Sequence, residues 1–176
     1  MIRSWKSSAA SVRWMSDQAL STEEIEKARG SLRFEEYLAR YGSLTYRNKG
    51  VSMMPLLKEG RDLFTLVPKG AGRCKKYDVV LYKNRKDQYV LHRIVEVRPE
   101  EYVIRGDNTY SDEHYKDSDI LAVMTSFVHK GKEHTVDEAG YRFYSALRTK
   151  TYPLRKQYFR LRHFGGRILR RLGLRK

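Results

Sequence analysis

Three polar residues in the middle of the chain are of the types that form an activated serine nucleophile. Ser52 follows a glycine-containing turn, His92 lies inside an apolar run, and Asp107 stands in a Gly-Asp-Asn sequence. A serine hydroxyl hardly ionises near neutral pH, so a neighbouring base must take its proton as it attacks a carbonyl carbon. Histidine suits this task because it ordinarily titrates at about pH 6.5 and is largely neutral in the cytosol. We therefore expect His92 to act as the base and Asp107 to fix its tautomer.

The backbone next to Ser52 is expected to bind the negative charge that develops on the substrate. Gly50 permits a tight turn that exposes the Ser52 hydroxyl. The turn formed by Gly50, Val51 and Met53 would point backbone N–H groups at the oxyanion. Taken singly, a serine in such a loop is typical of a turn, and a histidine in a strand is typical of a buried structural residue. Their joint occurrence is what indicates a catalytic site.

The order of these motifs resembles the signal peptidase I and LexA-like serine peptidase superfamily over about residues 50–130. That superfamily has a Gly-x-Ser-Met-x-Pro motif, then a Gly-Asp element, a strand with the general base, and a Gly-Asp-Asn turn. The corresponding segments here begin at Gly50, Tyr77, His92 and Gly106. The resemblance implies a serine endopeptidase whose base is His in place of Lys, as in archaeal and endoplasmic-reticulum signal peptidases.

The chain departs from the superfamily pattern at two positions. Tyr77 replaces the glycine of the Gly-Asp element, and Gly50 stands where many signal peptidases have a serine that binds the oxyanion. The Ser/His branch also uses a carboxylate shortly after the Gly-Asp-Asn turn. Asp112 is therefore the second choice after Asp107 for the residue that orients the base, and Glu113 lies in the same neighbourhood.

Short segments rich in Val, Ile, Leu and Tyr surround these motifs and predict β-strands. The clearest candidates are residues 63–67, 78–82, 89–97, 102–105 and 120–128, with turns at 83–87 and 98–101. Since no helix separates them, we expect a mainly β (α+β) fold with an antiparallel, partly closed, LexA/signal-peptidase-like sheet. Ser21 and Glu24 have the spacing of a capping box, which predicts a preceding helix that ends near Gly42.

Charge divides the chain unevenly. The 176 residues include 36 Lys or Arg and 21 Asp or Glu, a net charge of +15, and no acidic residue follows Glu138. We therefore expect an N-terminal helical segment at 1–43, a peptidase domain at 44–138 and a basic helical tail at 139–176. Beyond Pro153, apolar residues recur at three- and four-residue steps between arginines. Such a helix could lie on an anionic membrane, bind nucleic acid or pack on the sheet.

Several classes of protein are excluded by composition. Cys74 is the only cysteine, so neither an intrachain disulfide nor a multi-cysteine metal site is possible, and the histidines have no metal-ligand spacing. We expect no metal and no cofactor. No stretch approaches 18 apolar residues, and no secretory signal is recognised. A cytoplasmic protein, at most peripheral at the cytoplasmic membrane face, is expected.

The expected partner is a peptide or protein substrate that lies in extended form along a sheet edge. Two alternatives stay open. A LexA-like regulator associated with DNA would need two or three helices before the peptidase domain, and the acidic start at Glu23 and Glu24 disfavours phosphate contact. A catalytically silent peptide-binding module would use the same cleft.

Overall fold

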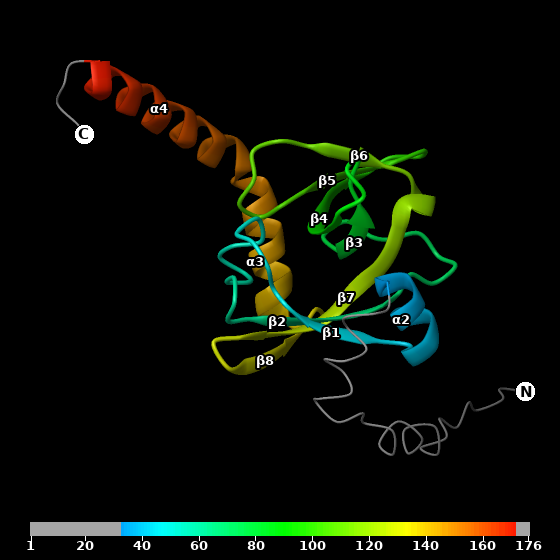
Figure 1. Cartoon of the computed structure of the whole chain (residues 1–176). Coiled ribbons are helices and arrows are strands. Elements are labelled where there is room, and N and C mark those ends of the chain that lie inside the picture. The colour runs from blue at the N-terminus through cyan, green and yellow to red at the C-terminus, as the bar shows by residue number, and fades with distance from the viewer. Residues whose placement is uncertain (1–32, 172–176) are drawn as a thin grey trace, which may run out of the picture.

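A sheet of eight antiparallel strands is the central element of the computed structural model, which describes residues 33–171 (Figure 1). The strands are β1 (Leu44–Arg47), β2 (Leu63–Pro68), β3 (Val79–Lys83), β4 (Tyr89–Val97), β5 (Tyr102–Arg105), β6 (Glu113–Tyr115), β7 (Ile120–His129) and β8 (Lys132–Thr135). Their order is β1-β2-β7-β3-β4-β5-β6, and β8 pairs with β7. Within the described residues this order does not return on itself. The fold is mainly β, as predicted, but the sheet is open where partial closure was predicted.

The aliphatic segments form strands as predicted. The bounds of β4 and β5 agree with the prediction, and those of β2, β3 and β7 differ by one residue. Both predicted turns connect neighbouring strands, between β3 and β4 and between β4 and β5. The sequence did not identify β1, β6 and β8 as strands. Each has only three or four residues, which is too short to show a reliable alternation.

The helix before the sheet ends where the sequence predicted. Helix α2 (Phe34–Tyr41) stops at Gly42, which has a φ of 75° and whose amide donates to the Leu38 carbonyl at 2.9 Å. This left-handed cap is a common way for a helix to end, and glycine adopts it without strain. Leu38 is buried in the main core. However, α2 begins only at Phe34, after Arg33 in an extended conformation, so the single helix predicted from Ser21 to Gly42 is interrupted at Arg33. The residues around Ser21 lie outside the described residues.

The central strands are covered on both faces. Val79 of β3 belongs to the larger hydrophobic cluster and Val80 to a smaller one. In the register of β3 with β4, Val79 pairs with Arg93 and Val80 pairs with His92. Because paired residues share a face of the sheet, His92 and Arg93 point to opposite faces. Both are buried, so each needs polar partners on its own side.

The first part of the basic C-terminal segment belongs to the body of the protein. Helix α3 (Ala139–Lys150) lies against the sheet, and α4 (Tyr152–Arg171) extends away from it (Figure 1). Tyr141 and Ser145 of α3 are buried. The residues just after Glu138 therefore pack on the same body as the strands that precede them. No helix in the part of the chain described here has the length and apolar composition needed to cross a membrane.

Candidate active site

Ser52 lies in a series of tight turns between β1 and β2 that is closed at its base by Asn48. The Asn48 amide donates to the Asp62 carbonyl at 2.9 Å. Its side-chain Nδ2 donates to the carbonyls of Gly50, at 3.0 Å, and Leu57, at 3.2 Å. Asn48 is buried, so these bonds form away from solvent. One side chain thus fixes both ends of the segment that carries Ser52.

A buried carboxylate, Asp62, stabilises the end of the same loop next to β2. Asp62 accepts hydrogen bonds from Arg61 Nε at 2.6 Å, from the Lys58 amide at 2.8 Å and from the Lys130 amide at 3.2 Å. His129 Nδ1 lies 3.0 Å away. Burial by itself raises the pKa of Asp62, but the hydrogen bonds, above all from Arg61, lower that pKa far below its ordinary value of 3.8. Asp62 is therefore ionised at neutral pH and holds the loop end of β2 to the β7–β8 turn.

The Ser52 turn docks directly on the Gly-Asp-Asn turn. The Asn108 amide donates to the Ser52 carbonyl at 2.7 Å, and Asn108 Nδ2 donates to the Val51 carbonyl at 3.2 Å. A Cβ atom on Gly106 would lie 2.8 Å from the Ser52 carbonyl oxygen and 2.9 Å from His92 Nε2. Only glycine allows this approach. The fold thus brings together the three segments that the sequence singled out.

The hydroxyl of Ser52 and the backbone beside it are free to meet a substrate. Among residues 33–171, the Ser52 hydroxyl and the amides of Val51, Ser52 and Met53 have no hydrogen-bond partner. Gly50 has a φ of 84° and shapes the turn, as expected. Its N–H, however, donates to Glu59 Oε1 at 2.8 Å. The amides left for an oxyanion are therefore those of Val51, Ser52 and Met53.

His92 is held from one side of its ring. Its Nδ1 lies 2.9 Å from the Tyr82 hydroxyl and 3.2 Å from Glu113 Oε1. The hydrogen bond with His92 holds the pKa of Glu113 below its ordinary value of 4.5, and burial raises the pKa of Tyr82. An ionised carboxylate can only accept hydrogen bonds, so it favours the tautomer with the proton on Nδ1. Nε2 then keeps its lone pair on the side of Ser52.

The carboxylate expected first at His92 is used elsewhere. Both oxygens of Asp107 accept from Arg93, from Nε and Nη2 at 2.8 Å each, and Oδ2 also accepts from the Tyr144 hydroxyl at 3.0 Å. The Asp107 carbonyl accepts from Arg148 Nε at 3.0 Å. Asp107 therefore ties the turn to β4 and α3, and its carboxylate is not hydrogen-bonded to His92.

The second choice, Asp112, also points away from the histidine. It is paired with Arg105. Glu113, the next residue, begins β6 and pairs in register with Ile104, which in turn pairs with Ile94. Ile94 lies two residues after His92 on the same strand, so this row of side chains shares its face. Strand alternation across β4, β5 and β6 would have selected Glu113, had β6 been recognised.

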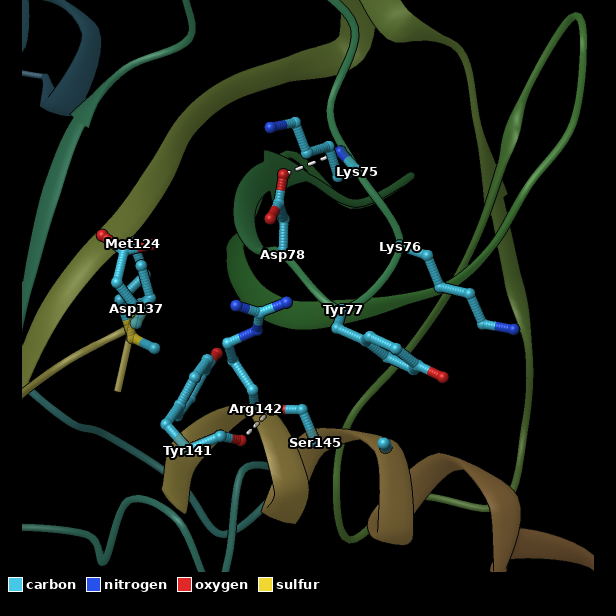
Figure 2. A pocket seen from close by; sticks show the side chains of 11 residues that line it. Lys75, Lys76, Tyr77, Asp78, Met124, Asp137, Tyr141, Arg142 and Ser145 are labelled. Atoms are coloured by element: carbon cyan, nitrogen blue, oxygen red, sulfur yellow. Dashed lines mark hydrogen bonds between the residues drawn. The ribbon is translucent and has the colours of Figure 1, made fainter. Parts of the chain in front are cut away.

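The departure from glycine at Tyr77 has a structural counterpart. Tyr77 has a φ of 82°, in the left-handed region that favours glycine. Its amide donates to the Ile94 carbonyl at 2.8 Å and its carbonyl accepts from Arg93 Nη1 at 3.0 Å. Figure 2 shows Tyr77 facing Arg142 and Ser145 of α3 across a pocket of about 540 Å³. The surrounding hydrogen bonds hold this residue in a conformation that its side chain disfavours.

A second pocket adjoins the Ser52 turn. Its volume is about 310 Å³, and Pro55 and Leu56 of the turn line it together with Phe127 of β7 and Tyr144 of α3. The lining is mostly apolar, so an apolar side chain fits it better than a charged one. The pocket lies a few residues along the chain from the free hydroxyl.

Comparisons with known proteins identify no family. No protein-family model matches the chain, and a search of the curated proteins finds no match. Within the described residues, no group of three or more His, Cys, Asp or Glu side chains could hold a metal ion. What the site can do must therefore be inferred from its own geometry.

Proposed function

We propose that the protein is a serine endopeptidase with Ser52 as nucleophile and His92 as general base. The observation that carries this proposal is the close approach of the Ser52 turn and His92 Nε2 to the same face of Gly106. In the proposed reaction the Ser52 hydroxyl gives its proton to this nitrogen. Hydrogen bonds between nucleophile and base are often long in unliganded enzymes and shorten when substrate binds.

The proposed reaction begins when Ser52 Oγ attacks the carbonyl carbon of a peptide bond and its proton passes to His92 Nε2. The carbonyl oxygen becomes an oxyanion and accepts hydrogen bonds from among the free amides of Val51, Ser52 and Met53. As the C–N bond breaks, His92 gives its proton to the leaving amine. A water molecule then attacks the acyl-enzyme and loses its proton to His92, which passes it to Ser52 Oγ as the ester bond breaks and the carboxylic acid leaves.

Glu113 replaces Asp107 and Asp112 in the proposed site as the residue that positions His92. When His92 takes the proton of Ser52, it becomes a cation inside a largely buried environment. The Glu113 carboxylate, 3.2 Å from Nδ1, stabilises that cation and holds the ring. Tyr82 keeps its phenolic proton and packs beside the ring, which limits rotation of the imidazole.

An extended peptide is the substrate that this site fits best. β1 pairs only with β2 among the described strands and leads directly into the Ser52 turn. A peptide that adds to this edge would gain backbone hydrogen bonds and bring a carbonyl to Ser52. Val51 is exposed beside the nucleophile, so access is open. The apolar pocket at Pro55 and Leu56 would take one apolar side chain of the substrate.

The left-handed conformation of Tyr77 supports the resemblance to the signal peptidase I and LexA-like superfamily. The superfamily has glycine at this position, and the backbone here adopts the conformation that glycine prefers. A LexA/signal-peptidase-like fold is accordingly part of the proposal. The open antiparallel sheet and the adjacent Ser52 and Gly106 turns are the features that support it.

Cleavage of a peptide library tests the proposed function across many candidate sequences at once. The full chain is incubated with peptides prepared from a whole proteome, and mass spectrometry records new termini. Ser52→Ala and His92→Ala should each abolish cleavage while circular dichroism stays unchanged. Ser118→Ala, a change at an exposed serine outside the site, is the matched control and should cleave normally.

Two results would contradict the proposal. Cleavage that survives in Ser52→Ala would exclude this serine as the nucleophile. A wild-type protein that binds library peptides but cleaves none would favour the catalytically silent binding module.

A further inference from the structure

A stripe of apolar side chains runs along the outer side of α3 and α4. Five large residues are exposed there: Phe143 (70%), Leu147 (49%), Leu154 (75%), Tyr158 (66%) and Leu161 (61%). They follow one another at steps of four, seven, four and three residues. In a helix of about 3.6 residues per turn, such steps keep side chains on one side. We call these five residues the outer stripe.

The two helices form one rod that bends where α4 leaves the body (Figure 1), and the outer stripe continues across the junction. Thr151 at the junction has a φ of −81° and a ψ of 0°. Its amide donates to the Leu147 carbonyl at 2.9 Å, and its carbonyl accepts from the Arg155 amide at 3.1 Å. These are the i to i+4 hydrogen bonds of an α-helix. The rod runs along the body and then projects from it (Figure 1).

The opposite side of the rod already has a partner. The residues that contact the body from this side include Tyr141, Ser145, Arg148, Tyr152 and Arg155. Arg148 donates to the carbonyls of Asp107, at 3.0 Å, and Met54, at 3.4 Å, and so touches both turns of the candidate site. The outer stripe lies on the other side of the rod and faces away from the body.

The surface around the outer stripe is positively charged. Residues 139–171 contain no Asp or Glu. Arg142, Lys150 and Arg160 are exposed, and none has an acidic partner among the described residues. Exposed apolar side chains therefore alternate with uncompensated cations along the rod.

We propose that the outer stripe binds the surface of an anionic lipid membrane, with the rod lying along the interface. Phe143, Leu154 and Leu161 would enter the boundary between headgroups and acyl chains, and the cations would meet lipid phosphates. A nucleic acid would satisfy the cations but would leave the large apolar side chains in water, because phosphate contacts come from Arg, Lys and polar groups. The proposal is independent of the peptidase activity.

Vesicle flotation of the full chain tests the proposal. The probes are vesicles of phosphatidylcholine alone and vesicles that also contain phosphatidylglycerol. We expect flotation with the anionic vesicles only. Binding should weaken at least tenfold between about 0.1 M and 1 M salt, as the Debye length falls from about 10 Å to about 3 Å.

Removal of the apolar contacts should abolish flotation. The variant Phe143→Ser/Leu154→Ser/Leu161→Ser should lose at least tenfold in vesicle affinity without a change in circular dichroism, because all three side chains are exposed. The matched control is Tyr41→Ser/Val97→Ser, which removes exposed apolar side chains elsewhere on the body. The control should bind within twofold of wild type.

A second pair of variants separates the local charge from the net charge. Lys150→Gln/Arg160→Gln should weaken binding to anionic vesicles several-fold. Lys86→Gln/Lys132→Gln changes the net charge equally at exposed positions outside the rod and should have a smaller effect. Equal losses in the two variants would overturn the assignment of binding to the rod.

Three other outcomes would also overturn the proposal. The first is unchanged flotation of the apolar triple variant. The second is binding to duplex DNA in preference to anionic vesicles, retained in that variant. The third is a wild-type protein that does not bind vesicles but forms a dimer, which the triple variant disrupts. That result would identify a second copy of the chain as the partner of the outer stripe. Ser52→Ala should float like wild type, so failure of the peptidase proposal and failure of this one are distinguishable.

Discussion

Two polar clusters lie on opposite faces of β4, one around Arg93 and one around His92. In the Arg93 cluster the guanidinium is 1% exposed and donates from Nε, Nη1 and Nη2. Its Nη1 alone reaches the Tyr77 carbonyl, the Tyr141 hydroxyl and Ser145 Oγ. Every part of this cation has a partner.

The His92 cluster is incomplete by comparison. Nδ1 has two partners, but Nε2 has none among the described residues. The Glu113 carboxylate that holds the ring is partly exposed, with 31% of its side chain accessible. One ring nitrogen is thus oriented and the other is left open beside Ser52.

The two clusters differ in how completely the hydrogen bonds of their buried groups are satisfied. A buried charge whose hydrogen bonds are all satisfied holds elements together and has little left to offer a substrate. A buried histidine with one unsatisfied nitrogen has the arrangement that the proposed proton transfer requires. The two clusters are centred on adjacent residues of β4. Residue type alone does not reveal which cluster has an unsatisfied atom.

The largest effect is expected from Arg93→Met, because it leaves Asp107 buried without its cation. Such a loss costs about 3–5 kcal/mol in the free energy of unfolding. Urea denaturation followed by circular dichroism measures it. Arg98→Met, at an exposed ion pair, is the control and should have no measurable effect. A small change in the free energy of unfolding for Arg93→Met would show that the Arg93 cluster does not stabilise the fold.

Glu113→Gln should act on the reaction and leave the fold intact. With a neutral partner, His92 loses both the preference for its Nδ1 tautomer and the stabilisation of its cation. We expect kcat to fall about 100-fold, equivalent to about 2.7 kcal/mol. Turnover of a peptide found in the library experiment provides the measurement. Asp112→Asn should be near wild type, and the reverse ranking would return the orienting role to Asp112.

Asp62 extends the comparison to pH. Its pKa in the folded state is below 3.8, so its carboxylate stabilises the folded state fully above about pH 4 and loses this effect as the pH falls. We expect Asp62→Asn to cost about 2 kcal/mol at pH 7 and clearly less at pH 3. Urea denaturation at both pH values tests this. An equal cost at both would mean that the charge of Asp62 does not matter.

The smallest expected effect concerns the strained residue beside Arg93. Tyr77→Gly should be more stable than Tyr77→Ala by about 1 kcal/mol, because only glycine adopts a φ of 82° without strain. The two variants lose the same ring, so their difference isolates the backbone. Thermal unfolding of both provides the comparison. If alanine is the more stable of the two, the left-handed conformation is not maintained.

Prediction from the sequence succeeded where local patterns decide the structure. Aliphatic runs predicted β4 and β5, and Gly42 marked the end of α2, because strand alternation and helix caps are local features. The order of the motifs predicted that the segments at Ser52, His92 and Gly106 lie together. The structure confirms that they lie together, while their catalytic roles remain proposals.

The sequence offered Asp107, Asp112 and Glu113 but could not show which carboxylate meets His92, because that depends on strand register and on distant contacts. The pairing of β6 with β5 places Glu113 beside His92. Asp107 instead accepts hydrogen bonds from Arg93, which points to the other face of β4. The contact of α3 with that same cluster through Ser145 also joins residues far apart in the chain. The charge pattern predicted a separate tail because charged residues indicate a solvent-exposed segment. It does not reveal the few buried residues of that segment, such as Tyr141 and Ser145.

The rod formed by α3 and α4 contacts the body with one side and carries the outer stripe on the other. Its width therefore sets the distance between the Ser52 turn and a membrane bound to the outer stripe. Arg148, on the inner side, touches the Asp107 and Met54 carbonyls, and a helix with its side chains is about 10–12 Å across. A membrane bound to the outer stripe would therefore hold the Ser52 turn within a few nanometres of the lipid. Enzyme and any substrate tethered to the same surface would then search in two dimensions. Their encounter rate would depend on the effective concentration in that thin layer, far above the concentration in bulk solution.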